Sequence, residues 1–415
     1  MDALYFYAIG FLLVWILALL FRDKLKIEVH GPLLMRKTLR MRGFIDKVAS
    51  KKFNIKHRQL TREFRGRKIN LEIGPTLSPW TAIVNIGIPV SFALVVYLIY
   101  ILLITLPTIF TNPQAGLILP GVDLPGSPIF IPLGYGIIGL ATAMVVHEFG
   151  HGIMARIEKV KIKSIGVLLL AVLPGAFVEP DEGDIKKSSR MSKIRIYAAG
   201  SVSNLLLAGI TFLLVLGISN FAIGPSFHSD GMYLDSIVPA SPASEVLKPG
   251  MIIESINGHK TTNITDYIKA TTGIKIGDVV TFQTNQGTFK ITAIKNPNNS
   301  SKAYIGYRPD NNLVLNENVA KTYGNQLPWG WFYLNDLFFW IFLLNFAVGT
   351  FNLLPMKPLD GGLIFEEALS SKLSDNWVNK IVLSSSYIFI AIIITSIIFG
   401  PLKGIWIIIQ KSLGG

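Results

Sequence analysis

The hydropathy pattern of the chain is dominated by long apolar runs that are separated by polar segments. The runs cover about residues 3–21, 82–106, 134–157, 196–218, 329–354 and 381–399. Crossing the hydrocarbon core of a bilayer takes about 20 residues of α-helix, and each run approaches or exceeds that length. Half of the residues are hydrophobic and only 16% are charged, which is typical of a chain with several spans and a smaller soluble part. The pattern therefore predicts a polytopic α-helical membrane protein with about six transmembrane helices.

The first apolar run is followed directly by a strongly basic loop. Residues 22–70 contain 16 Lys and Arg against 4 Asp and Glu, and this excess of 12 accounts for nearly all of the net charge of +13. A cleaved signal peptide carries its positive charges before its apolar stretch, so we interpret residues 3–21 as a retained span. The positive-inside rule predicts that loop 22–78 is cytoplasmic. The loop either binds the anionic inner leaflet or is a solvated face, and we expect no nucleic-acid partner.

Alternation of the spans across the bilayer gives the predicted domain organisation. The parts are an anchor and basic loop (1–78), a second span and external connection (79–133), two halves of a membrane core (134–223 and 326–415) and an inserted external domain (224–325). The last span is expected to end in a short amphipathic tail from residue 401. We expect the protein in the cell membrane, with both termini on the external side.

The inserted segment 224–325 has the composition of a soluble α+β domain. It combines alternating strands, such as Met232 to Val238, with Pro-Gly, Asn-Gly and Gln-Gly turns. Its passage Pro239 to Gly258, which includes Leu-Lys-Pro-Gly-Met-Ile-Ile-Glu-Ser-Ile-Asn-Gly, resembles a PDZ domain. PDZ-like domains bind extended peptides by strand addition. A peptide-binding role and a purely structural role both fit this segment.

The third apolar run contains ionisable residues where a lipid-spanning helix normally has none. It reads Met-Val-Val-His147-Glu148-Phe-Gly-His151-Gly. In a helix, His147 and His151 lie on one face and Glu148 lies beside them. Such residues are expensive inside a membrane and usually functional, so the motif predicts a metal site, with an interior histidine pair and a glutamate partner as the alternative. The chain has no cysteine, so His, Asp or Glu must supply every side-chain ligand to zinc.

Two histidines leave a catalytic zinc site short of one protein ligand and a water. Asp360 is the predicted third ligand, because it follows the broken end of run 329–354 and precedes Gly361 and Gly362, which permit close approach. The alternative is that Asp360 caps a helix that starts at Gly361. Four further acidic residues are rival ligands or a solvated turn. They are Glu179, Asp181, Glu182 and Asp184.

The segment directly after the motif is apolar but too short to be a full span. Residues Lys161 to Val178 are interrupted by Pro174 and Gly175, which predicts a hairpin or a re-entrant element. Irregular backbone at membrane depth is tolerated only against protein or a water-filled cavity. We therefore expect this segment to line the site.

Two separated motifs, one at each of two spans, carry a resemblance to a known family. His147-Glu148-Phe-Gly-His151, the distant Asn352-Leu-Leu-Pro-Met-Lys-Pro-Leu-Asp360-Gly-Gly and the PDZ-like insertion between them resemble the site-2 protease family of intramembrane zinc metalloproteases. The resemblance implies one zinc ion per chain, bound by His147, His151 and Asp360. It also implies that Glu148 is the catalytic carboxylate and that Asn352 holds the substrate backbone or its oxyanion.

A third stretch of the chain also resembles that family. Ala-Ala-Gly-Ser-Val-Ser-Asn204 is similar to its small-residue and asparagine motif, although Ser201 stands where many members have proline. The small residues should let this span approach the histidine helix closely, and Asn204 is expected to form a hydrogen bond between helices. The first 130 residues lie outside the resemblance, which extends over about residues 134–400.

Taken together, these features predict a zinc-dependent intramembrane endopeptidase in which Glu148 activates the zinc-bound water. Its expected partners are transmembrane protein substrates, the lipid bilayer, and a peptide or substrate segment at the PDZ-like domain. A transmembrane substrate is a helix whose amides are hydrogen-bonded internally, so local unwinding must precede cleavage. The alternative function is a metal-binding transporter or a proteolytically inactive scaffold that uses the PDZ-like domain.

Overall fold

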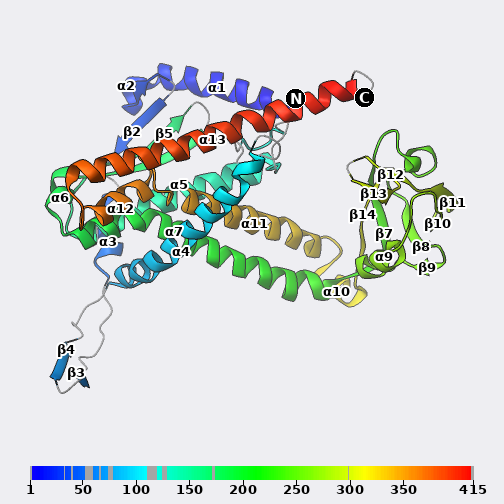
Figure 1. Cartoon of the computed structure of the whole chain (residues 1–415), viewed down its shortest axis with the longest axis horizontal. Coiled ribbons are helices and arrows are strands. Elements are labelled where there is room, and N and C mark those ends of the chain that lie inside the picture. The colour runs from blue at the N-terminus through cyan, green and yellow to red at the C-terminus, as the bar shows by residue number, and fades with distance from the viewer. Residues whose placement is uncertain are drawn as a thin grey trace. The chain divides into compact units, whose positions relative to one another are not determined.

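The protein consists of two compact units, and most of their helices and strands are labelled in Figure 1. The computed structural model describes residues 2–31, 33–38, 41–51, 59–64, 67–72, 78–109, 119–123, 129–170, 173–297 and 299–412. The membrane unit comprises Met1–Leu214 and Asp336–Gly415, and the inserted unit comprises Val215–Asn335.

Among the described residues, five helices are long and apolar enough to cross a membrane. They are α4 (Pro79–Thr105), α5 (Leu133–Ile157), α7 (Arg190–Gly217), α11 (Leu327–Phe351) and α13 (Asp375–Ser412). Many of their large apolar side chains are exposed, for example Phe92 at 71% and Leu213 at 67%, as expected of helix faces that lipid covers. Helix α5 is the most enclosed of the five. In its 18-residue apolar stretch 39% of the residues are buried, against 6% to 22% in the other four helices.

The apolar part of the first helix is shorter than expected from the sequence, and the last helix is longer. The first apolar run forms helix α1 (Asp2–Leu20), but its apolar part, Tyr7–Leu20, is shorter than the five spans, so a sixth span stays a prediction. The tail expected from residue 401 is not a separate element, because α13 continues through Pro401 to Ser412. The run Ile-Trp-Ile-Ile-Ile at residues 405–409 extends the apolar character of this helix beyond the proline.

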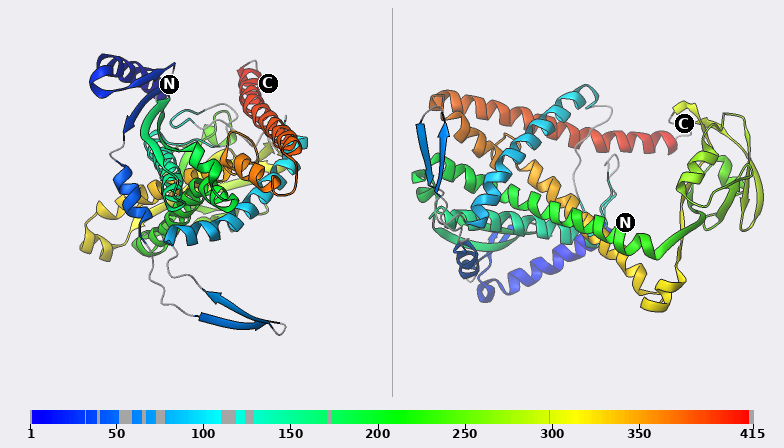
Figure 2. Two further views of the ribbon diagram at one scale, coloured as in Figure 1. Left: turned by 90° about the vertical axis from the view of Figure 1, so that its left-hand side faces the viewer. Right: turned by 90° about the horizontal axis from the view of Figure 1, so that it is seen from below.

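A four-stranded antiparallel sheet belongs to the membrane unit. Its strands, in spatial order, are β1 (Glu28–His30), β2 (Leu33–Thr38), β5 (Ile162–Leu170) and β6 (Leu173–Pro180). The segment after the histidine motif is therefore a β5–β6 hairpin, one of the two predicted forms. Strand β6 lies at the edge of the sheet and alongside α5 (Figure 2). Strand β2 extends the hairpin from the basic loop, with Arg36 opposite Val167, a pairing that the sequence analysis did not predict.

The basic loop also contributes a short helix that packs against α5. Helix α3 (Arg42–Ala49) buries Ile45 completely, in a cluster with Ile153 of α5 and Val178 of β6. An ion pair fastens the same contact, since Arg156 Nε lies 2.5 Å from Asp46 Oδ1. The remaining short elements of the loop are α2 (Arg22–Leu25) and a separate hairpin of β3 (Gln59–Phe64) and β4 (Arg67–Glu72).

The inserted unit is an α+β domain built around one main sheet. The strands of this sheet run in the order β11 (Gly287–Thr292), β10 (Val279–Thr284), β8 (Ile252–Ile256), β7 (Phe227–Ile237) and β14 (Tyr307–Leu315), and β9 (His259–Lys260) pairs with β8. A second hairpin contains β12 (Ile294–Asn296) and β13 (Asn299–Tyr304). The helical elements are a π-helical turn (Ile218–Ile223), α8 (Gly224–Ser226), a 3-10 turn (Pro242–Glu245), α9 (Ile264–Thr271) and α10 (Glu317–Tyr323).

Alternation along the strands explains the core of the inserted unit. Met232, Leu234, Ile253 and Phe282 are all 0% exposed, because every second residue of a strand faces the same side of the sheet. Helix α9 begins at the N-cap residue Asn263, whose side chain accepts a hydrogen bond from the Asp266 N–H. The first part of the unit runs in the order strand β7, 3-10 turn, strand β8 and, after β9, helix α9.

The contact between α3 and α5 can be tested by truncating its central side chain. Ile45→Ala should weaken the docking of α3 by about 2–5 kcal/mol, because it leaves a cavity in a fully buried position. Amide hydrogen exchange at residues 42–49 of the detergent-solubilised chain should become faster. Ile45→Val, which removes one methylene, should cost about 0.5–1.5 kcal/mol and give an intermediate rate. Unchanged exchange in the alanine variant would contradict this role of Ile45.

Candidate metal centre

The two histidines of α5 are arranged as their spacing predicts. They lie one helical turn apart, and their Nε2 atoms are 3.1 Å from each other. Their rings meet edge to face with centroids 4.7 Å apart. Their side chains are only 11% and 13% exposed, so lipid and bulk water have little access to them. The helix therefore directs two nitrogen ligand atoms to one point inside the protein.

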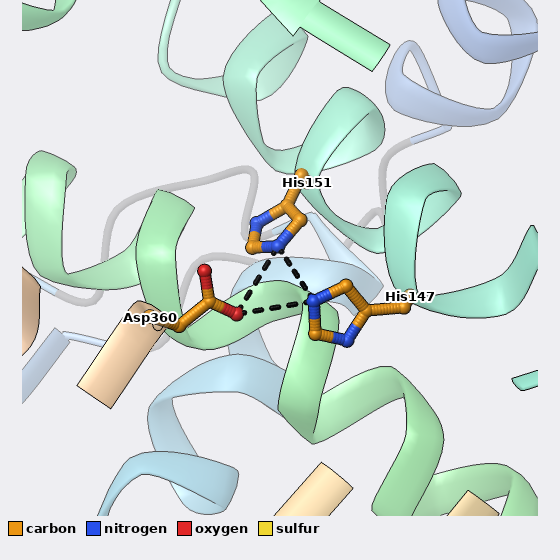
Figure 3. Close-up of side chains that lie close together, drawn as sticks. All are labelled: His147, His151 and Asp360. Atoms are coloured by element: carbon orange, nitrogen blue, oxygen red, sulfur yellow. Dashed lines mark hydrogen bonds and ion pairs between the residues drawn. The ribbon is translucent and has the colours of Figure 1, made fainter. Parts of the chain in front are cut away.

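Asp360 brings an oxygen atom to the same point. It is the first residue of α12 (Asp360–Leu369), and its Oδ2 lies 3.2 Å from the Nε2 atoms of both His147 and His151, as Figure 3 shows. Leu359, not Asp360, is the N-cap residue of this helix. The carboxylate thus faces the histidines. The alternative interpretation, in which Asp360 caps the helix, does not fit this position.

The arrangement of the three ligand atoms fits a zinc ion. Oδ2 of Asp360 is buried, and the Nε2 atoms of His147 and His151 lie 3.2 Å from it. When both rings are neutral with their hydrogens on Nδ1, three lone-pair acceptors face one another, a costly arrangement unless a cation satisfies them. Ligands about 2.0–2.1 Å from a tetrahedral zinc ion lie roughly 3.3 Å apart, close to the separations found here. Among the residues that the structure describes, His147, His151 and Asp360 are the only group of three or more His, Asp or Glu side chains placed so that they could hold a metal ion.

A sharp turn between α11 and α12 places Asp360. A Cβ atom on Gly361 would lie 2.0 Å from the carbonyl oxygen of Leu353, and one on Gly362 would lie 2.5 Å from the carbonyl carbon of Met356. Neither position can accept a side chain without moving backbone. The two glycines therefore let the start of α12 pack directly against the turn that precedes it.

Asn352 lies beside this turn, at the end of α11. Its carbonyl accepts a hydrogen bond of 2.8 Å from the N–H of Gly361, the residue that follows Asp360. Its side-chain amide donates to the carbonyl of Val348 in the last turn of α11, at 3.0 Å. The structure thus brings the backbone of Asn352 next to Asp360, while its amide group is engaged within α11.

Glu148 is held by the hairpin that follows the motif. Its Oε2 accepts a hydrogen bond of 2.9 Å from the backbone N–H of Val178 in the edge strand β6. The carboxylate therefore sits between the histidine helix and the sheet. A hairpin that lines the site was expected from the sequence, but a backbone donor has no signature in the sequence.

Helix α7 passes so close to the histidines that one position has no room for a side chain. A Cβ atom on Gly200 would lie 2.4 Å from His151 Nε2 and 2.8 Å from His147 Nε2. From the sequence, Gly200 was expected only to be one of several small residues that permit close helix packing. Its specific role depends on where α7 crosses α5, which local sequence does not encode.

Both histidines also have partners on α7 at their second ring nitrogens. His151 Nδ1 lies 2.7 Å from the carbonyl oxygen of Ile196. His147 Nδ1 lies 3.3 Å from the side-chain nitrogen of Asn204, which is the hydrogen bond between helices predicted for this asparagine. Helix α7 thus contacts each imidazole at Nδ1, in addition to the approach of Gly200 to both Nε2 atoms.

The acidic cluster after the hairpin has structural partners. Asp181 is the N-cap of α6 (Glu182–Lys187) and accepts a hydrogen bond from the Asp184 N–H, which lowers the pKa of Asp181. The carboxylate of Glu179 accepts a hydrogen bond from the hydroxyl of Ser164. None of these residues belongs to the metal-binding group found among the described residues.

Gly200→Ala tests how closely the ligand atoms are enclosed. The added methyl group would overlap both Nε2 atoms, so we expect zinc affinity to fall at least about tenfold, the range seen when ligand positioning is disturbed. Competition with a chromophoric chelator on the purified chain measures this loss. Gly209→Ala, on the same helix with nothing within 4 Å of its Cβ position, is the matched control and should bind zinc as the wild type does. Equal affinity in both variants would contradict the close approach of α7.

The chain is similar to a peptidase family and to proteins from an archaeon and a plant. The family model of Peptidase family M50 matches residues 135–393. An uncharacterized protein of Methanocaldococcus jannaschii is 33% identical over 236 residues, which are 56% of this chain and 56% of that protein. A membrane-bound transcription factor site-2 protease homolog of Arabidopsis thaliana is 27% identical over 130 residues, which are 30% of this chain and 25% of that protein. The chain thus spans about half the length of the Methanocaldococcus protein and a quarter of the length of the Arabidopsis protein.

Two further similarities are to a bacterial protein and to a solved structure. A Clostridium perfringens protein named as a zinc metalloprotease is 24% identical over 302 residues, with 57% of this chain and 87% of that protein covered. The crystal structure of the PDZ domain of an SdrC-like protein from Listeria monocytogenes is 23% identical, covers 22% of this chain and 92% of that chain, and has a TM-score of 0.17. The M50 match covers more than half of the chain and includes His147, Glu148, His151 and Asp360. This chain is therefore a member of Peptidase family M50, the site-2 protease family of zinc metalloproteases.

Proposed function

We propose that this chain is a zinc-dependent intramembrane endopeptidase that cuts peptide bonds within or near the transmembrane helices of its substrates. The observation that carries the proposal is the convergence of His147 Nε2, His151 Nε2 and Asp360 Oδ2 within 3.2 Å of one another. Two members of this group lie on α5, the most enclosed of the apolar helices, where Glu148 directly follows His147. Membership of a peptidase family adds independent support.

The three ligand atoms would hold one zinc ion per chain. A bound zinc ion supplies Lewis acidity, which polarises a peptide carbonyl and makes water a nucleophile near neutral pH. His147 and His151 contribute neutral nitrogen donors, and Asp360 contributes one negative charge. A position is left for water and substrate, as a catalytic rather than a structural site requires.

Glu148 takes the proton from the attacking water and later delivers it to the leaving amine. With its Oε2 held by the Val178 N–H, the other carboxylate oxygen, Oε1, makes this transfer. The same hydrogen bond orients the carboxylate at a fixed side of the site.

Asn352 is the proposed donor to the substrate backbone or its oxyanion. Its amide would have to exchange its hydrogen bond with the Val348 carbonyl for one with the substrate. The cost is small, because one neutral hydrogen bond replaces another. The backbone contact between Asn352 and Gly361 would keep the donor close to Asp360 during this exchange.

The proposed topology follows from the basic loop and the alternation of spans. Loop 22–78 is cytoplasmic, and the inserted PDZ-like unit and both termini are external. Helix α5 then runs from outside to inside, so the cut falls towards the inner side of the bilayer. The inserted unit would bind a peptide or a segment of the substrate on the outer side.

Glu148→Gln separates a protease from a metal transporter or an inactive scaffold. Removing the base should lower cleavage of a single-span substrate by about 10²–10⁴-fold while zinc content is retained, because Glu148 is not among the three ligands. Cleavage in proteoliposomes and bound zinc are measured on the same preparation. The matched control is Glu158→Gln just beyond α5, since Glu158 pairs with Arg195 rather than the metal group. Cleavage by the Glu148 variant at the wild-type rate would refute the proposed chemistry.

Substrate choice should follow the ease of local unwinding. A substrate span of leucine only should be cut much more slowly than the same span with a central glycine or proline, which weaken a helix by about 1 and 3 kcal/mol. The cleaved fraction of paired reporter proteins at equal expression measures the difference. Efficient cleavage of the all-leucine span would argue against unwinding as a requirement.

A further inference from the structure

A buried asparagine contacts His147 at Nδ1, the ring nitrogen that does not face Asp360. Asn204 lies on α7 and is 0% exposed. Its side-chain nitrogen is 3.3 Å from Nδ1 of His147, whose Nε2 is one of the three ligand atoms. His151 has a different partner at the same ring position, namely the backbone carbonyl of Ile196 at 2.7 Å.

Metal binding through Nε2 determines what the partner of Nδ1 must be. A neutral imidazole carries one hydrogen, so a lone pair on Nε2 places that hydrogen on Nδ1. An N–H donor inside a protein needs an acceptor, because an unpaired buried polar group is costly. The carbonyl of Ile196 can only accept, and it therefore suits the Nδ1–H of His151 without adjustment.

The amide of Asn204 can meet the same requirement after a half-turn of its side-chain amide group. The oxygen and nitrogen of an amide are nearly the same size, so this rotation exchanges them with little change in packing. Asn204 Oδ1 has no hydrogen-bond partner among the described residues, so no such bond opposes the exchange. The oxygen then faces Nδ1 and accepts its hydrogen.

We propose that Asn204 is a positioning residue for zinc, which accepts the Nδ1–H of His147 through Oδ1 and thereby keeps Nε2 available to the metal. This rests on the proposed zinc-dependent function. Second partners of this kind fix both the tautomer and the ring orientation of a histidine ligand. The two histidines thus differ, since backbone orients His151 and a side chain orients His147.

Asn204→Asp is the sharpest test, because a carboxylate can accept from Nδ1–H but has no amide hydrogen to donate. The full-length chain in detergent, titrated with zinc against a chromophoric chelator, should bind zinc with the wild-type dissociation constant or a lower one. Asn204→Leu, which has no acceptor, should bind zinc about 10–100-fold more weakly. Tenfold weaker binding by the aspartate variant would overturn the proposal, because it would mean that the amide nitrogen is the group that matters.

A second buried asparagine provides the matched control. Asn345 on α11 is also 0% exposed, and its amide contacts Thr142 of α5 and the carbonyl of Ile341 rather than a histidine. Asn345→Leu should leave zinc affinity unchanged, and an equal loss there would overturn the proposal by showing a general packing effect. Wild-type affinity in Asn204→Leu would overturn it while leaving the proposed function intact. A wild-type chain that binds no zinc would overturn the proposed function and this inference with it.

Discussion

The enclosure of the polar side chains of His147, His151 and Asp360 among apolar helices is the constraint on which the membrane unit depends. Hydrocarbon cannot solvate histidine and carboxylate groups, so protein must surround them. Glycines of α5 make this possible. A Cβ atom on Gly139 would lie 3.1 Å from the carbonyl oxygen of Trp340 in α11, and one on Gly150 would lie 2.5 Å from that of Ala199 in α7. Close backbone approach on both sides therefore excludes lipid from the face that bears the motif.

The position of Asp360 is secured from outside the ligand group. Lys193 of α7 pairs with Glu367 of α12 at 2.9 Å, and both side chains are only about one-fifth exposed. Lys357, in the turn before α12, pairs with Glu366 at 2.7 Å. Partly buried pairs of this kind are screened less than surface pairs, so they can orient a short helix. The carboxylate of Asp360 is thus held near His147 and His151 by contacts of α12 that do not themselves require a metal.

The sequence predicted most of what depends on local periodicity. Spacing within one helix determines which side chains share a face, so the relation of His147 to His151 followed from the motif alone. The five long apolar helices and the β5–β6 hairpin followed from run length and from Pro174 and Gly175. The position of Asp360 beside the two histidines was predicted less directly, from a broken helix, from a glycine pair and from the family resemblance.

Features that depend on chain segments far apart were not predicted. Strand β2 pairs with β5 across more than a hundred residues, and its sequence contains no local signal for that partner. The need for glycine at residue 200 arises from the crossing of α5 and α7, and the general pattern of small residues could not single out that position. Helix α13 continues beyond Pro401, although a proline is a local signal that breaks a helix.

The contact between Glu148 and the hairpin shows why some functional groups leave no trace in side-chain identity. The hairpin contributes a backbone N–H, so any residue except proline at position 178 could supply the same donor. The side chain of Val178 serves a different purpose, since it packs with Ile45 and Ile153 under α3. Packing of that side chain holds the strand in place, and the strand in turn holds the carboxylate. The hydrophobic contact with the basic loop and the orientation of Glu148 are therefore two consequences of a single residue's position, one through its side chain and one through its backbone.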